Sequence, residues 1–145
     1  MIQKQESIII KTIARILVPF IQLFGLYVIM HGHSSPGGGF QGGVILGASF
    51  ILLAIAYGTD GMQSRFSEKV MTFLTSGGVF LYAAIGALCL LLGANFLDYG
   101  ILEALPIIPQ GLGRYMGMFG IELGVGITVM AVMVSIFYDL LHFEE

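Results

Sequence analysis

Hydrophobic residues gather in four long runs with almost no charged residues, and shorter polar segments separate the runs. The runs cover about residues 12–30, 42–58, 70–94 and 115–138. Each is long enough for a membrane-spanning helix, which needs about 20 apolar residues. Because no polar segment between them exceeds a loop, we predict an all-α membrane protein with a single four-helix domain over residues 1–145.

The first two runs are joined by the segment HGHSSPGGGFQGG, residues 31–43, which contains six glycines and one proline. Proline fixes φ and lacks a backbone N–H, and glycine adopts angles closed to other residues, so we expect a tight turn here instead of a helix. Ser34 or Ser35 would then cap the second helix. The residues that define the turn motif are Pro36, Gly37, Gly38, Gly39, Phe40, Gly42 and Gly43.

Positively charged residues are distributed unevenly between the two ends of the expected helices. Five of the six lie at the end that holds both termini, namely Lys4, Lys11, Arg15, Arg65 and Lys69. Only Arg114 lies at the other end. Because lysine and arginine are retained on the cytoplasmic side during insertion, we predict that both termini are cytoplasmic. The glycine-rich turn and the proline-containing loop 95–114 then lie together on the outer side.

Composition agrees with a membrane location. The chain is 57% hydrophobic and 10% charged, with a mean hydropathy of +0.93, which leaves too little polar surface for a soluble domain. The net charge of -3 is small and scattered, so we expect no nucleic-acid partner. Cys89 is the only cysteine and lies in an apolar run, so we expect it to contribute to packing, with no internal disulfide.

Glycines recur along one side of the third and fourth runs. Small residues let helix backbones approach closely, so we expect these positions at helix–helix contacts, either within this chain or with a partner. The glycines expected to pack in this way are Gly78, Gly86, Gly93, Gly117, Gly120 and Gly124.

Glu122 is the one acidic residue well inside an expected span. A carboxylate in the hydrocarbon layer must be protonated, paired with a cation or in contact with water, and embedded acids commonly mark ion or proton paths. We therefore consider Glu122 a candidate for such a path. The structural alternative is a protonated glutamate that forms a hydrogen bond with a neighbouring helix.

His31 and His33 follow the first span, where imidazole groups can exchange protons near neutral pH. They are candidates for a gate or relay, and the alternative is that both form hydrogen bonds with loop carbonyls. Their i, i+2 spacing does not favour joint metal binding, and we expect neither a metal nor a cofactor. The glycine run lacks the Lys-Ser/Thr ending of a phosphate-binding loop, and no catalytic set is present, so we do not expect an enzyme.

The string LFGLYVIMHGHSSPGGGFQGGVILGASFILLAIAYG resembles the B subunit of the Mrp-type multisubunit sodium/proton antiporters, whose hallmark is PGGGF followed by a Gly-Gly pair. The resemblance extends more loosely over the whole chain, including GIELGVGI around Glu122. It implies a small multi-pass subunit of a prokaryotic cytoplasmic membrane that assists ion or proton translocation, and assembly, beside larger antiporter-like subunits. Na⁺ and H⁺ would be the transported ions, and those subunits and the lipid bilayer the partners.

Three alternatives remain open at this stage. Homologous subunits also occur in the sodium-translocating module of membrane-bound hydrogenase-like respiratory complexes. An autonomous small dimeric proton-coupled exporter would have its essential acid in the first helix, whereas the first run here has none. A purely structural spacer is supported by the glycine-rich helix faces and by the lack of a second embedded charge.

Overall fold

The computed structural model describes residues 6–34, 37–58 and 67–142, and four long helices account for most of them. They are α1 (Glu6–Met30), α2 (Gly39–Tyr57), α4 (Glu68–Leu91) and α5 (Gly113–His142), with a short 3-10 helix, η1 (Tyr99–Ala104), before α5. All four are long and apolar enough to cross a membrane. The predicted all-α class is therefore confirmed, with four helices of the length and composition needed for membrane spans.

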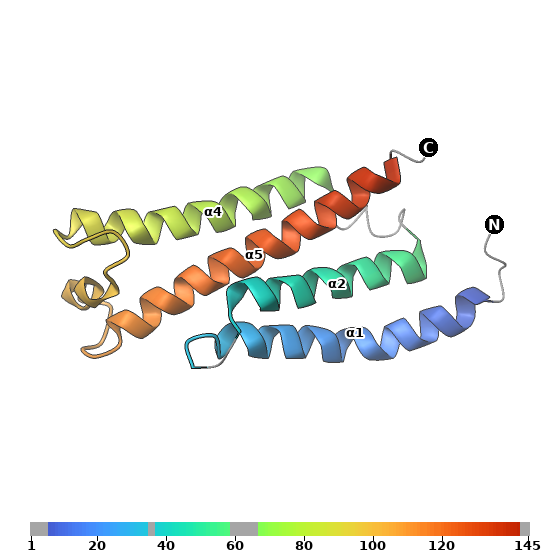
Figure 1. Cartoon of the computed structure of the whole chain (residues 1–145), viewed down its shortest axis with the longest axis horizontal. Helices are drawn as coiled ribbons and strands as arrows, with labels where there is room; N and C mark the ends of the chain where they lie inside the picture. The colour runs from blue at the N-terminus through green and yellow to red at the C-terminus, as the bar shows by residue number, and fades with distance from the viewer. Residues whose placement is uncertain (1–5, 35–36, 59–66, 143–145) are drawn as a thin grey trace.

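The four helices lie side by side in one row, in the order α1, α2, α5, α4 (Figure 1). α2 packs on α1 and α5, and α5 packs on α2 and α4. α2 is consequently the most buried of the four spans, while α1 and α4 form the outer edges. The row thus leaves α1 and α4 with broad apolar faces for lipid or for partner helices.

The start of α1 and the end of α5 lie at one end of the row, and the turn after α1 lies toward the other, together with η1 (Figure 1). This is the relative arrangement expected from four spans. The orientation of the row in the membrane remains a prediction from the charge distribution.

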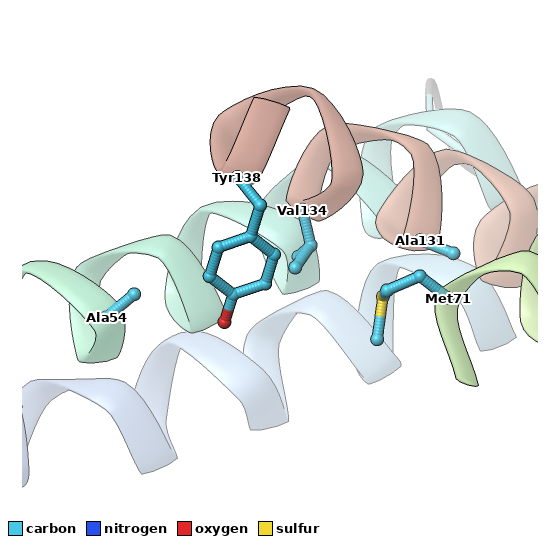
Figure 2. Packing of buried hydrophobic residues seen from close by; sticks show 5 residues of the cluster. All are labelled: Ala54, Met71, Ala131, Val134 and Tyr138. Carbon is cyan, nitrogen blue, oxygen red and sulfur yellow. The ribbon is translucent and has the colours of Figure 1, made fainter. Parts of the chain in front are cut away.

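A small hydrophobic core fixes α5 between α2 and α4 at the end near the termini. Figure 2 shows its members, Ala54, Met71, Ala131, Val134 and Tyr138. They come from the last turn of α2, the first turn of α4 and the C-terminal half of α5. This contact lies far along α5 from Glu122, so the core positions the helix without enclosing the embedded acid.

The glycine-rich segment differs from its prediction, because α2 begins at Gly39, inside the expected turn. The N-cap residue is Gly38, which provides no side-chain hydrogen bond. Ser34, one of the two predicted caps, instead donates its hydroxyl to the carbonyl of His31 at 3.3 Å. Ser35 and Pro36 lie outside the described residues. α1 and α5 approach the first turn of α2 so closely that larger side chains would not fit there, which explains the glycines in this turn.

Gly93 also differs from its prediction. It lies after the end of α4 with a φ of +89°, and a Cβ added there would meet nothing within 4 Å. The backbone N–H of Ala94 donates to the carbonyl of Cys89 at 3.1 Å, as in the glycine-dependent ending of many helices. Gly93 therefore terminates α4 and, among the described residues, packs against no other helix.

Candidate functional site

The carboxyl group of Glu122 lies directly against the turn between α1 and α2. A Cβ on Gly38 would lie 3.3 Å from Oε1 of Glu122, and a Cβ on Gly32 would overlap the carboxyl group. Glu122 is itself half-buried. Its carboxyl group therefore occupies space that exists only because both turn residues lack side chains.

The main chain at Glu122 contacts the first turn of α2 just as closely. A Cβ on Gly39 would lie 2.9 Å from Cα of Glu122 and would overlap its carbonyl oxygen. One turn further along both helices, a Cβ on Gly43 would lie 2.6 Å from the carbonyl oxygen of Gly126. Small residues one turn apart on both helices thus bring α2 and α5 into backbone contact at the embedded acid.

The N-terminus of α2 gives the site a favourable partial charge for an anion. The first backbone N–H groups of a helix have no partner within that helix, and they form the positive end of its dipole. Gly38 offers them no side-chain cap, and α2 contains no aspartate, glutamate, lysine, arginine or histidine. The carboxyl group of Glu122 is thus the acidic group placed beside this helix end.

His33 lies near Glu122, on the side of the site toward the start of α5. Its ring packs edge-on against Tyr115, with centroids 4.9 Å apart and an interplanar angle of 86°. Tyr115 in turn stacks on Phe119. Tyr115, Phe119 and Glu122 are spaced by four and three residues and so share one side of α5. His33 interacts electrostatically with the Glu122 carboxyl group, while its own side chain is exposed.

His31 takes a different direction from His33. Its Nδ1 lies 3.1 Å from the carbonyl oxygen of Tyr27, one turn back on α1. Its ring also stacks on the Tyr27 ring, with centroids 4.2 Å apart. The structure therefore separates the two candidates, because His31 packs along α1 and His33 packs on α5.

The remaining residues of the turn motif differ in what they contact and in how far they are exposed. Gly42 packs against α1, since a Cβ there would overlap Ile29 and lie 2.8 Å from the carbonyl oxygen of Gly25. Gly37 is half-buried, and Phe40 is 61% exposed, so its ring is available to lipid or to a partner. No group of three or more histidine, cysteine, aspartate or glutamate side chains suited to a metal occurs within residues 6–34, 37–58 and 67–142.

The predicted packing glycines of α4 and α5 lie away from Glu122 and meet residues of this chain. Gly78 lies against Gly124 and Thr128, at the contact between α4 and α5. Gly120 lies against Ile85 of α4. Two others face the loop before α5, because Gly86 meets the ring of Phe96 and Gly117 meets the ring of Tyr99.

Two residues of the site were not predicted from the sequence. Gly32 contacts the carboxyl group of Glu122, and Tyr115 supports His33. The heptad spacing between Tyr115 and Glu122 places them on one side of a helix and was a usable signal for Tyr115. No sequence signal pairs Gly32 with Glu122, because that contact depends on how α1 and α5 pack.

Comparison with known proteins identifies the family. Residues 9–135 match a domain described as related to the MnhB subunit of Na⁺/H⁺ antiporter. Proteins named antiporter subunit mnhB2 from Staphylococcus aureus strains Newman, JH1 and Mu3 are each 30% identical to this chain over 139 residues. The match covers 94% of this chain and 96% of each relative. Both descriptions name a subunit of an antiporter, which is a transporter. The chain therefore belongs to the MnhB family of Na⁺/H⁺ antiporter subunits.

Proposed function

We propose that this chain assists Na⁺/H⁺ exchange beside larger antiporter subunits, and that Glu122 is an ionisable group in the path of the ion or proton. One observation carries the proposal: Glu122 belongs to α5, a helix long and apolar enough to span a membrane, and its carboxyl group lies against the glycine turn and the N-terminus of α2. Membrane-embedded acids are costly and commonly belong to ion or proton paths.

The surroundings of Glu122 suit a group that changes its charge during transport. Placing a charged side chain at the centre of a spanning helix costs about 2.5–3.5 kcal/mol on insertion scales. The N-terminus of α2 and a protonated His33 would each lower that cost for the ionised form. Gly32 and Gly38 bring backbone atoms of the turn close to the carboxyl group, where side chains would otherwise lie.

A purely structural role for Glu122 predicts a different outcome from a transport role. In the structural case, the carboxyl group only provides hydrogen-bond acceptors for the turn or for the start of α2. Glu122→Gln keeps the shape and one acceptor oxygen but cannot titrate. It therefore separates the two roles without creating a cavity.

The experiment measures exchange by the complete antiporter in membrane vesicles that contain equal amounts of assembled complex. We expect the Glu122→Gln complex to assemble normally and to exchange Na⁺ for H⁺ more slowly than the wild type. Glu122→Asp should retain part of the rate with a changed pH dependence, because its shorter side chain moves the carboxyl group. A wild-type rate for Glu122→Gln at every pH would leave Glu122 as a structural residue.

The partners and the membrane orientation also belong to the proposal. We place the chain in a prokaryotic cytoplasmic membrane with both termini cytoplasmic, supported by the charge distribution. The exposed aromatic residues of α1 and α4, including Phe20, Phe73 and Phe80, offer faces to lipid and to partner helices. The subunit composition of the gently solubilised complex tests the partners. Antiporter subunits alone support the proposal, whereas iron–sulfur or nickel proteins would assign the chain to a respiratory complex.

A further inference from the structure

We infer that His33 transfers protons between the aqueous surface and Glu122, and that Tyr115 holds its ring in position for this transfer. The inference rests on the proposed role of Glu122 and adds the route by which protons reach its carboxyl group. Of the two histidines in the turn, the packing selects only one for this task.

The geometry of His33 supports the assignment. The exposed imidazole can take protons from water, and its ring packs on Tyr115, seven residues before Glu122 on the same side of α5. His33 and Glu122 are also coupled electrostatically. An imidazolium at His33 would release its proton to the Glu122 carboxylate, directly or through water, and the resulting neutral imidazole would take up a new proton from the surface.

Two other charged or titratable side chains near the turn, among the described residues, contact other parts of the chain. His31 packs on Tyr27 of α1, and α2 contributes no acidic, basic or histidine side chain. Arg114 precedes Tyr115 in the chain, but its Nε lies 3.7 Å from the Cβ position of Gly100, on the side of η1. Tyr115 and Glu122 are therefore the titratable groups of α5 that face His33.

The test compares sodium flux at low and high concentrations of a membrane-impermeant proton buffer. The purified complete complex is reconstituted into liposomes, and uptake of radioactive sodium is measured for the wild type and for His33→Gln. At low buffer we expect His33→Gln to be several-fold slower than the wild type. High buffer on the turn side should restore most of the lost rate, because mobile buffer replaces the missing imidazole. The wild-type rate should change little with buffer concentration.

Three further variants complete the test. Tyr115→Ala should show a smaller loss of sodium flux at low buffer, which high buffer also restores. This variant replaces His33→Gln in the test if His33→Gln assembles poorly. His31→Gln should lose less activity than His33→Gln and show no buffer dependence. Ser34→Ala, an exposed change in the same turn, should behave as the wild type.

Two results would overturn the inference. One is a wild-type rate for His33→Gln at low buffer, and the other is a slow rate that buffer does not restore, which would indicate a structural role for the imidazole. Either result can occur together with a reduced sodium flux for Glu122→Gln in the same assay. In that case the proposed role of Glu122 stands, and only the role of His33 as its proton donor is wrong. A wild-type rate for Glu122→Gln would remove both.

Discussion

α5 packs on α2 along one side and on α4 along the other, and glycine brings the backbones together at both contacts. On the α2 side, Gly39 and Gly43 meet Glu122 and Gly126. On the α4 side, Gly78 meets Gly124, where a Cβ on Gly124 would lie 2.9 Å from the carbonyl oxygen of Gly78. The same kind of glycine packing therefore serves two contacts, and the first of them also encloses the carboxyl group of Glu122.

The polar groups at the two contacts also differ. Thr128, a polar side chain at the α4 contact, has its hydroxyl 2.9 Å from the carbonyl oxygen of Gly124 in its own helix and 3.5 Å from that of Thr75 in α4. These backbone acceptors satisfy the hydroxyl, which carries no charge. Glu122 instead faces the turn and the N-terminus of α2, which come from elsewhere in the chain. We therefore expect changes at the α4 contact to alter assembly alone, and changes around Glu122 to alter transport as well.

The largest effect on assembly is expected for Gly39→Ala. The added Cβ would overlap the carbonyl oxygen of Glu122, which belongs to a helix backbone and cannot rotate away. Overpacking of this kind costs about 1–3 kcal/mol and sometimes more. The matched control is Gly77→Ala in α4, where a Cβ meets nothing within 4 Å. The yield of assembled complex from membranes should fall for Gly39→Ala and stay normal for Gly77→Ala, and equal yields would show that the α2–α5 contact is looser than described.

Gly78→Ala should have an intermediate effect. Its Cβ would overlap the hydroxyl of Thr128, which can rotate, but would also lie 2.5 Å from the carbonyl oxygen of Gly124. We expect a lower thermal stability of the complex, measured by its loss of monodispersity on heating, with a wild-type exchange rate per assembled complex. A reduced rate per complex would contradict the assignment of the α4 contact to assembly alone.

Gly120→Ala should have a small effect. The added Cβ would lie 2.7 Å from Cδ1 of Ile85, the far end of a flexible side chain that can change its rotamer. Alanine also favours a helix over glycine by about 1 kcal/mol, which offsets part of the packing cost. The thermal stability of this variant should stay close to that of the wild type. A loss as large as that of Gly78→Ala would mean that Ile85 is held rigidly.

The sequence predicted the four spans from the lengths of the hydrophobic runs. The number of spans then predicted that the glycine-rich turn and the loop 95–114 lie at the same end of the helices. The sequence placed the start of α2 three residues too late, since glycine and proline usually argue against helix. Here the close approach of α1 and α5 requires glycine at Gly39, Gly42 and Gly43 and overrides the local preference. Gly93 was misassigned for a related reason, because a glycine at helical spacing can also end a helix.

The site itself was predictable only in part. Glu122 and His33 could be selected because ionisable groups in or beside apolar runs are uncommon. The proximity of Glu122 and His33 could not be predicted, because Glu122 lies in the last helix and His33 lies in the turn after the first helix. It depends on the row arrangement, which places α2 between α1 and α5. The difference between His31 and His33 likewise depends on which helix each ring contacts.

The smallest effects on assembly are expected for Glu122→Gln and Thr128→Val, and their comparison tests the central claim most directly. Both change one polar side chain of α5, and the two positions lie on opposite contacts of that helix. The measurement is the rate of Na⁺/H⁺ exchange per assembled complex in vesicles across pH. We predict that Glu122→Gln lowers this rate and changes its pH dependence, while Thr128→Val leaves both at the wild-type values. Equal rates for Glu122→Gln and Thr128→Val would contradict the claim that only the α2 side of α5 takes part in transport.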